Sequence, residues 1–401
     1  MYALYCRIYQ AILRAVSYVL PWRQPELIDG ENSLDRLPKR IQEQGISSVL
    51  IVTDKGILSV GLIDSLLQGL KEAGIRYAVY DKTVPNPTVD NIMEATGVYR
   101  QNKCEAIIAF GGGSPMDCGK GVGAQIARPN KTISQMRGLL KVRKRIPPFF
   151  AVPTTAGTGS EATLAAVITD SKTHEKYAIN DVSLIPYFAV LDPTLTRKLP
   201  PHLTATTGMD ALTHAVEAYI GKSNTNKTKS LSEKAVKLIF DNIYTAYSDG
   251  DNLQARDNMQ KASYYAGVAF TRAYVGYVHA IAHTLGGLYG VPHGLANAVI
   301  LPYMLTYYGK SVYTPLARLA ERTGIAAAGD TAEQKARAFI QAIEDLNRNM
   351  DIPAAIDGIR ESDIPIMTQR ACREANPLYP VPRILSERDI HAVIDMIKAR
   401  P

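Results

Sequence analysis

The chain has 401 residues, 46% of them hydrophobic and 21% charged, and a formal net charge of +7. This length allows two domains with a large core, and the mild charge without a long basic tract argues against a nucleic-acid partner. The four cysteines are far apart and form no CxxC pair: Cys6, Cys104, Cys118 and Cys372. The pattern argues against a disulfide framework and a zinc ribbon, and it favours a reducing, cytoplasmic compartment.

Residues 1–20 are mostly apolar, and their polar side chains form a narrow stripe at helical spacing: Arg7, Gln10, Arg14 and Ser17. Two arginines inside the stretch argue against a transmembrane span, and no small-residue cleavage site closes it as a signal peptide. The pattern predicts an amphipathic helix with a wide apolar face. That face could pack on its own subunit, pack on a second subunit in a homodimer, or lie peripherally in a membrane interface.

Short apolar runs alternate with helical patterns from residue 47 to about residue 126. They predict strands at 48–53, 76–80 and 105–110, and helices at 61–73, at 88–100 and after residue 117. Strand, helix and strand at this spacing predict βαβ units and a parallel sheet, an arrangement that binds ligands beyond the carboxyl ends of its strands.

Two features follow directly after predicted strands. The run Gly111-Gly-Gly-Ser114 would let backbone N–H groups approach a diphosphate at a helix N-terminus, although it is not a GxGxxG motif and could be a plain tight turn. Asp54 could accept hydrogen bonds from ribose hydroxyls and repel a 2′-phosphate, which favours NAD over NADP; a surface aspartate closing a strand is the alternative.

A further strand is predicted at 149–153, and the glycine- and hydroxyl-rich run 154–163 after it predicts a second loop around a polar ligand. A hairpin is expected at 167–170 and 177–179, and a last strand at 189–192. After Pro200 and Pro201 the pattern is helical throughout. These changes predict three parts, namely an amphipathic extension (1–30), an NAD-binding α/β domain (31–200) and a helical metal-binding domain (201–401).

Two helical stretches in the last part carry candidate metal ligands. Asp210 and His214 lie four residues apart, so both can grip one cation, although such pairs are also ordinary helix neighbours. His279 and His283 likewise share a helical face, and His293 follows after a glycine-rich turn. Three hydrogen-bonded core histidines are the alternative. One carboxylate with several imidazoles suits Fe(II) or Zn(II) better than Mg(II) or Ca(II).

Four motifs together resemble the iron-containing (group III) alcohol dehydrogenases: G-G-G-S-P-M-D, P-T-T-A-G-T-G-S-E-A-T, G-M-D-A-L-T-H-A-V-E-A-Y and H-A-I-A-H-x-L-G-G-x-Y-x-V-P-H-G-x-x-N-A. The likeness covers about residues 30–400. It implies a dehydroquinate synthase-like fold, with a dinucleotide-binding α/β domain, an all-α metal domain and an active site in the cleft between them.

The resemblance also implies roles for single residues. The metal ligands would be Asp210, His214, His279 and His293, while His283 would lie beside the nicotinamide instead of binding the metal. The cofactor positions would be Asp54, Asn86, Gly113, Ser114, Thr154, Thr155, Thr158, Thr163, Lys176, Leu203 and His283. Phe270 and Cys372 would line the substrate pocket, and Ala165 stands there where some relatives carry asparagine.

The chemistry implied is hydride transfer between a primary alcohol or aldehyde and NAD, with the substrate oxygen activated by Fe²⁺, or alternatively Zn²⁺. His283 is the candidate catalytic residue, orienting the nicotinamide ribose or passing a proton. Ala165 and Ala166 leave a roomier, less polar pocket, so we expect longer apolar alcohols as substrates. Relatives that act on phosphorylated substrates would need a basic cluster, but only Arg272 lies near the metal stretches. A non-enzymatic scaffold that docks on a membrane is the other alternative. Such a protein would not need the complete set of metal ligands that this chain carries.

Overall fold

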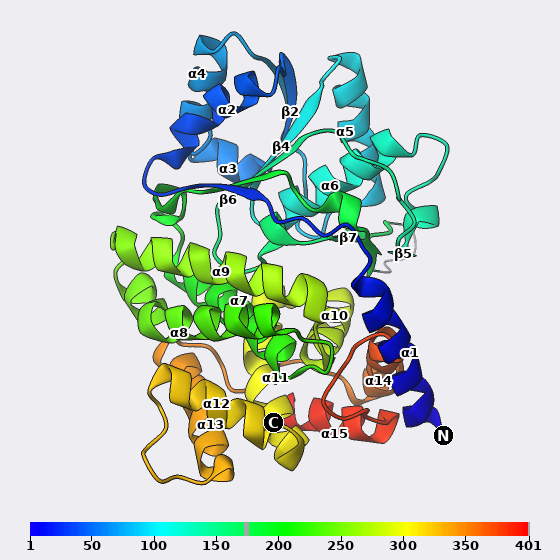
Figure 1. The fold of residues 1–401 in the computed structure, drawn as a ribbon, viewed down its shortest axis with the longest axis vertical. Coiled ribbons are helices and arrows are strands. Elements are labelled where there is room, and N and C mark those ends of the chain that lie inside the picture. The colour runs from blue at the N-terminus through cyan, green and yellow to red at the C-terminus, as the bar shows by residue number, and fades with distance from the viewer. Residues whose placement is uncertain (172–175, 400–401) are drawn as a thin grey trace. The chain divides into compact units, whose positions relative to one another are not determined.

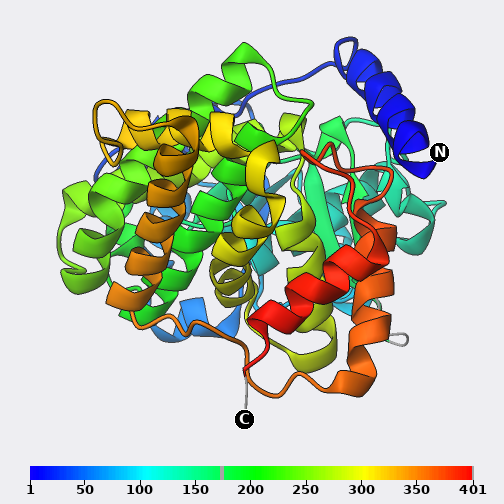
Figure 2. The same ribbon diagram turned by 90° about the horizontal axis from the view of Figure 1, so that it is seen from below.

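The structure is a computed structural model that describes residues 1–171 and 176–399 (Figures 1 and 2). The chain separates into two compact units. One comprises residues 21–198, and the other combines residues 1–20 with residues 199–401.

A six-stranded sheet forms the centre of the first unit. Its strand order is β1-β9-β6-β4-β2-β3, and every neighbouring pair is parallel. The strands are β1 (Glu26–Asp29), β2 (Ser48–Val52), β3 (Arg76–Tyr80), β4 (Ala106–Gly111), β6 (Phe149–Pro153) and β9 (Phe188–Leu191). Every residue of β2, β4, β6 and β9 is buried, which is why these strands are continuous apolar runs without alternation. The predicted parallel sheet is confirmed.

Helices cover both faces of this sheet, because successive strand residues point to opposite sides. On one face Leu50 and Ile107 pack against residues of α5 and α6. On the other face Ile51 and Ile108 pack against residues of α2 and α4. The helices are α2 (Leu37–Glu43), α3 (Lys55–Ser59), α4 (Asp64–Glu72), α5 (Val89–Gln101) and α6 (Gly113–Ala127).

The helix starts show how local sequence sets these elements. The helix predicted at 88–100 forms as α5, with Thr88 as its N-cap in a capping box with Asn91. The helix predicted from residue 61 begins three residues later. Gly61 has a φ of +67° and belongs to the preceding turn, so Asp64 opens α4 instead.

Two strands of the first unit were not predicted from the sequence. β1 has four residues, only one of them buried, and β5 (Gly138–Leu139) has two. Neither presents a hydrophobic run, because an edge strand needs only backbone pairing with a neighbour. Residues 26–29 therefore belong to the sheet, although the sequence analysis assigned them to the extension. The expected hairpin forms from β7 (Ala165–Thr169) and β8 (Lys176–Asn180), which pair antiparallel beside β5; residues 172–175 between them lie outside the described residues.

The second unit is built from helices, as predicted, and in its described part strand-type pairing is limited to one isolated bridge, Ile356 with Lys398. Its helices are α1 (Tyr2–Ser17), α7 (Pro201–Ile220), α8 (Asn226–Ser248), α9 (Leu253–Ala273), α10 (Tyr277–Tyr289), α11 (His293–Tyr308), α12 (Tyr313–Thr323), α13 (Ala332–Asn349), α14 (Ile364–Ala375) and α15 (Glu387–Ile397). Residues 208–220 of α7 are all buried, so this part of the helix is covered on every side and lies in the core of its unit.

Short 3₁₀ segments complete both units, and they serve as connectors between the longer elements. They are Ser33–Arg36, Ser134–Met136, Ser160–Ala162, Val182–Leu184, Pro193–Thr196, Gly309–Ser311 and Glu361–Asp363.

The N-terminal helix α1 lies on the helical unit. Arg7 donates a hydrogen bond to the carbonyl oxygen of Val381 (2.7 Å), and Gln10 donates one to the carbonyl oxygen of Tyr379 (2.7 Å). The predicted amphipathic helix thus forms and packs on its own chain through its polar stripe. In the part of the chain that the structure describes, no helix combines the length and the hydrophobicity needed to cross a membrane.

Candidate metal centre and dinucleotide loops

Three helices of the second unit supply the candidate metal ligands. Asp210 and His214 lie on α7, and His279 lies on α10. α10 ends at Tyr289 and is capped by Gly290 in the left-handed conformation, and α11 begins with His293 as its first residue. This tight reversal brings His293 back beside His279, with their ring centroids 5.4 Å apart.

The ligand atoms of three residues converge on one point. The Oδ1 atom of Asp210 lies 3.8 Å from Nε2 of His279 and 3.7 Å from Nε2 of His293. These separations are too long for hydrogen bonds. They are close to the spacing of about 3.4 Å between two ligand atoms that each bind a tetrahedral metal at about 2.1 Å. Asp210, His279 and His293 can therefore hold one metal ion.

His214 takes a different position from the other three residues. Its ring stacks between His279 (4.5 Å between centroids) and Phe270 (4.1 Å). The group of ligand atoms that lie within 4.8 Å of one another does not include a nitrogen of His214. The structure thus places this histidine next to the site, and its role as the fourth ligand stays a prediction.

Glu217, which the sequence analysis did not single out, orients His279. Its Oε2 atom lies 2.6 Å from Nδ1 of His279, and its carboxylate also accepts hydrogen bonds from the N–H groups of Gly276 (2.7 Å) and Val278 (2.9 Å). A carboxylate behind a ligating imidazole fixes the ring and raises its basicity towards the metal. Glu217 lies two helical turns after Asp210 on α7, and this spacing was the available signal in the sequence.

Burial leaves His279 neutral, with one ring nitrogen available to a metal. Its Nε2 atom is buried and has no hydrogen-bond partner among the described residues. Burial, together with the neighbouring histidines, holds the pKa of His279 well below its usual value, so the ring is neutral as a metal ligand must be. Burial tends to raise the pKa of Glu217, and the hydrogen bonds it accepts from Gly276, Val278 and His279 oppose this shift by favouring the carboxylate.

Asn297 is a second supporting residue that the sequence analysis did not single out. Its Nδ2 donates a hydrogen bond to Oδ1 of Asp210 (2.6 Å) and lies 3.2 Å from Nε2 of His293. The motif H-G-x-x-N places Asn297 one helical turn after His293, so both face the same side of α11. A side chain at Gly294 would approach the carbonyl oxygen of Thr206, so a glycine there lets α11 lie against α7.

His283 lies next to the ligands and is held by a separate carboxylate. Its ring stacks on His293 at 5.2 Å, and its Nδ1 lies 2.7 Å from Oε1 of Glu374 on α14. The hydroxyl of Tyr379 donates to the same Glu374 oxygen (2.8 Å). His283 therefore has a fixed orientation beside the candidate metal ligands.

In the first unit, the two predicted polar loops meet at the carboxyl ends of β4 and β6. Thr154 donates its N–H to the carbonyl oxygen of Gly111 (3.0 Å). A side chain at Gly113 would come within 2.9 Å of Thr158, so a glycine is needed for this approach. The hydroxyl of Ser114 accepts a hydrogen bond from the N–H of Asn86 (3.2 Å). Thr155 also lies close to this turn, because a Cβ atom at Gly112 would be 3.4 Å from its methyl group. Six predicted cofactor positions thus lie together: Asn86, Gly113, Ser114, Thr154, Thr155 and Thr158.

Lys120 holds the loop of residues 154–163 in place through hydrogen bonds. The sequence analysis did not identify this residue. Its ammonium group is fully buried, and Nζ donates to the hydroxyl (2.8 Å) and carbonyl (3.0 Å) of Thr163 and to the carbonyl of Ala165 (2.9 Å). It also donates to the carbonyl (2.7 Å) and the hydroxyl (3.0 Å) of Ser160. Asp117 accepts from the same hydroxyl of Ser160 (3.1 Å).

Three of the other predicted positions are more dispersed. Asp54 is the N-cap of α3 and accepts a hydrogen bond from the N–H of Ile57 (3.0 Å), and Lys176 opens β8. Leu203, on α7 in the helical unit, is 38% exposed.

Cys372 lies on α14, where burial and the carboxylates of Glu387 and Asp389 raise the pKa of its thiol to about 11. Its assignment to the substrate pocket, like that of Phe270 and Ala165, stays a prediction.

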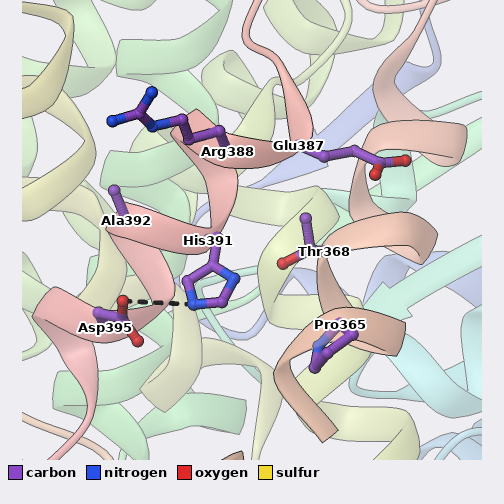
Figure 3. Close-up of a pocket in the computed structure, with 7 residues that line it drawn as sticks. All are labelled: Pro365, Thr368, Glu387, Arg388, His391, Ala392 and Asp395. Atoms are coloured by element: carbon purple, nitrogen blue, oxygen red, sulfur yellow. Dashed lines mark ion pairs between the residues drawn. The ribbon is translucent and has the colours of Figure 1, made fainter.

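A pocket of about 530 Å³ lies beside α14 and α15 and does not coincide with these sites (Figure 3). Its lining comprises Pro365, Thr368, Glu387, Arg388, His391, Ala392 and Asp395. Nε2 of His391 lies 3.4 Å from Oδ2 of Asp395, one turn further along α15, while Glu387 points away from them. None of the predicted metal, cofactor or substrate residues lines it.

Comparison with known proteins identifies the family. Residues 25–193 match the family of iron-containing alcohol dehydrogenases, and residues 204–397 match the C-terminal part of the same family. The chain is 41% identical over 368 residues to 1,3-propanediol dehydrogenase of Klebsiella pneumoniae, covering 91% of this chain and 95% of that protein. It is 35% identical over 376 residues to NAD-dependent methanol dehydrogenase of Bacillus methanolicus, covering 92% and 97% of the two chains.

A solved structure shows the same fold. The crystal structure of a 1,3-propanediol oxidoreductase superposes with a TM-score of 0.90 at 38% identity, covering 94% of this chain and all of the other. The chain belongs to the iron-containing alcohol dehydrogenase family. It is an NAD-linked oxidoreductase of the iron type that interconverts alcohols and aldehydes.

Proposed function

We propose that Asp210, His279 and His293, with His214 as the fourth ligand, bind Fe²⁺. The observation that carries this proposal is the buried Nε2 of His279, which Glu217 aims at Asp210 and which has no hydrogen-bond partner among the described residues. One carboxylate with imidazoles suits Fe(II), and Zn(II) is the alternative that elemental analysis would detect. When bound, the metal supplies Lewis-acid activation of the substrate oxygen.

The dinucleotide would be held by the two polar loops of the first unit. Backbone N–H groups at the start of α6 and the helix dipole favour an anionic diphosphate. One carboxylate oxygen of Asp54 caps α3. The other oxygen could accept a hydrogen bond from a ribose hydroxyl. We assign NAD contacts to Asp54, Asn86, Gly113, Ser114, Thr154, Thr155, Thr158, Thr163, Lys176, Leu203 and His283.

His283 is proposed to orient the nicotinamide ribose or to pass the substrate proton. Its hydrogen bond to Glu374 supports this role, because it fixes the ring plane and leaves Nε2 available for a second partner. The hydroxyl of Tyr379 in turn steadies Glu374.

The substrate is proposed to be a primary alcohol or aldehyde of medium chain length, with Ala165, Phe270 and Cys372 lining its pocket. Ala165 offers no polar side chain, so diols would lack a partner there. Each added methylene that is buried contributes about 0.8 kcal/mol. We expect kcat/KM to rise from ethanol to hexanol; a preference for ethanol or 1,3-propanediol would contradict this specificity and leave the reaction class intact.

We further propose a cytoplasmic homodimer with a peripheral membrane contact through residues 1–20. The four cysteines are all free, which supports a reducing compartment. The apolar face of α1 supports the contact with a membrane.

The metal assignment is tested by replacing His279 or His293 with alanine and measuring bound metal, NAD binding and activity. We expect metal content and activity to be nearly abolished while NAD still quenches the protein fluorescence. His391→Ala, on the exposed surface of α15, is the matched control and should keep the full metal content. Full activity of a metal-free His279→Ala protein would end the proposal.

A further inference from the structure

We propose that α1 lies in the plane of a bilayer and docks through its outer face on a surface that contains anionic phospholipid. This inference rests on the membrane contact proposed above and names the face, the orientation and the class of lipid. It is independent of the metal centre, because its evidence comes from α1 and the segment beneath it.

The inner face of α1 is fixed to the helical unit by polar contacts. Cys6 and Gln10 are buried there, and Gln10 donates hydrogen bonds to the carbonyl oxygens of Pro377 (3.0 Å) and Tyr379 (2.7 Å). Arg7, one turn before, donates to two further carbonyl oxygens of the same segment, 377–382. These contacts fix the rotation of α1 about its own axis. The opposite face of the helix therefore points away from the helical unit.

The outer face carries a continuous row of large apolar side chains. Residues four apart lie on one side of a helix, and this row is Leu4, Ile8, Ile12 and Val16, exposed by 64%, 53%, 59% and 40%. Tyr5 widens the row at 54% exposure. α1, drawn in dark blue, lies at the rim of the helical unit in both views (Figures 1 and 2). Exposed apolar patches of this kind mark interaction surfaces.

The charges around this row favour a lipid surface over a second copy of the chain. Residues 1–25 contain three arginines and no aspartate or glutamate. Arg7 and Arg23 donate hydrogen bonds to backbone carbonyl oxygens of the chain, whereas Arg14 is exposed. A second copy of α1 would bring the same positive charge and no carboxylate to pair with Arg14. Anionic headgroups supply the missing negative charge, and flanking tyrosine rings are typical of the boundary between headgroups and acyl chains.

The inner contacts also connect α1 to the candidate site. The segment that Gln10 holds includes Tyr379, whose hydroxyl donates to Glu374, the partner of His283. Substitutions on the outer face leave this connection untouched. Activity in buffer is therefore expected to survive them, which separates a docking defect from a catalytic one.

The test is flotation of the full-length protein with vesicles of phosphatidylcholine alone or mixed with phosphatidylserine. We expect the protein to float with the mixed vesicles, more weakly at high salt, and not with phosphatidylcholine alone. Ile8→Ser combined with Ile12→Ser should reduce flotation by roughly tenfold or more. Val60→Ser combined with Met93→Ser is the matched control, because both side chains are exposed in the other unit, and it should float like the wild type.

Two results would overturn the proposal. One is that the wild type does not float with the mixed vesicles. The other is that sedimentation shows a dimer that becomes a monomer in the Ile8→Ser, Ile12→Ser protein, because a second copy would then cover α1. NAD-linked alcohol oxidation measured in vesicle-free buffer reports separately on the proposed function. A protein that floats but is inactive would contradict only the catalytic proposal.

Discussion

At His279 the two ring nitrogens have different tasks. Nδ1 faces Glu217 at 2.6 Å, and Nε2 faces the candidate metal position beside Asp210. Because a carboxylate lies at Nδ1 and would hold its proton, the lone pair on Nε2 would be available to a cation bound beside Asp210. The chemistry of this residue therefore depends on Glu217, which does not touch the metal position itself.

Glu217→Gln should weaken metal binding by roughly tenfold to a hundredfold. The glutamine side chain has one acceptor oxygen, whereas the carboxylate accepts from three donors, so at least one of the N–H groups of Gly276, Val278 or His279 loses its partner. Competition with a chelator measures the affinity. NAD affinity should be unchanged, and Glu31→Gln, an exposed glutamate in the other unit, should behave like the wild type. Unchanged metal affinity in Glu217→Gln would show that Glu217 does not orient the ligand.

Asp54 permits a sharper test of cofactor choice than its removal would. Asp54→Asn keeps a side-chain oxygen to cap α3 at Ile57, so stability should change by less than about 1 kcal/mol. It removes the negative charge that repels a 2′-phosphate. The ratio of kcat/KM for NAD to that for NADP should fall by roughly tenfold or more. A wild-type protein that already prefers NADP would refute the role given to Asp54.

At the scale of elements, the junction of α6 with the loop 154–163 depends on one buried cation. The three N–H groups of Lys120 hold Thr163, Ser160 and Ala165, with five acceptor oxygens lying within 3.0 Å of Nζ. Burial lowers the pKa of Lys120 to about 8 and raises that of Asp117 to about 6, since both charges are removed from water. The free-energy cost of burying these two charges is offset by their mutual attraction and by the hydrogen bonds that Lys120 donates to the loop.

Lys120→Met should destabilise the protein by about 3–5 kcal/mol, because it leaves Asp117 and the loop carbonyls without their buried partner. In the folded fraction, the KM for NAD should rise much more than kcat falls, since Thr163 and its loop lose their position. Thermal denaturation and steady-state kinetics measure the two effects. Lys39→Met, on the exposed side of α2, should change neither. A normal KM for NAD in Lys120→Met would show that the loop 154–163 keeps its position without Lys120.

At the scale of the whole molecule, the candidate metal ligands all belong to the helical unit, and the glycine-rich turn and the threonine loop belong to the α/β unit. Each bound group should therefore stabilise the unit that holds most of its proposed contacts. Its contribution is about 2.7 kcal/mol when the free ligand is present at a hundred times its dissociation constant.

Removing the metal with a chelator should lower the Tm, because the convergence of Asp210 with His279 and His293 then has no cation to stabilise it. Adding NAD to the stripped protein should still raise the Tm. Scanning calorimetry of the metal-loaded and stripped protein, each with and without NAD, separates the two contributions. The same Tm before and after verified removal of the metal would contradict a metal ion bound by the folded state.

Much of the fold follows from local patterns. The buried strands β2, β4 and β6 are apolar throughout, and Thr88 opens α5 in a capping box, so both kinds of element were predicted from the sequence. The edge strand β1 was not predicted. It has one buried residue, and its structure comes from pairing with β9, a segment about 160 residues away in the chain.

The sequence by itself determined the ligand candidates on α7 and α10, because residues four apart on one helix must share a face. It could not show which of them meet. Only the tertiary structure brings His293 to Asp210 while His214 stacks on Phe270. It also decided the supporting residues. Lys120 has no local signature and Glu217 has only its spacing from Asp210, because a buried charge acquires its role from partners that packing brings to it from distant parts of the chain.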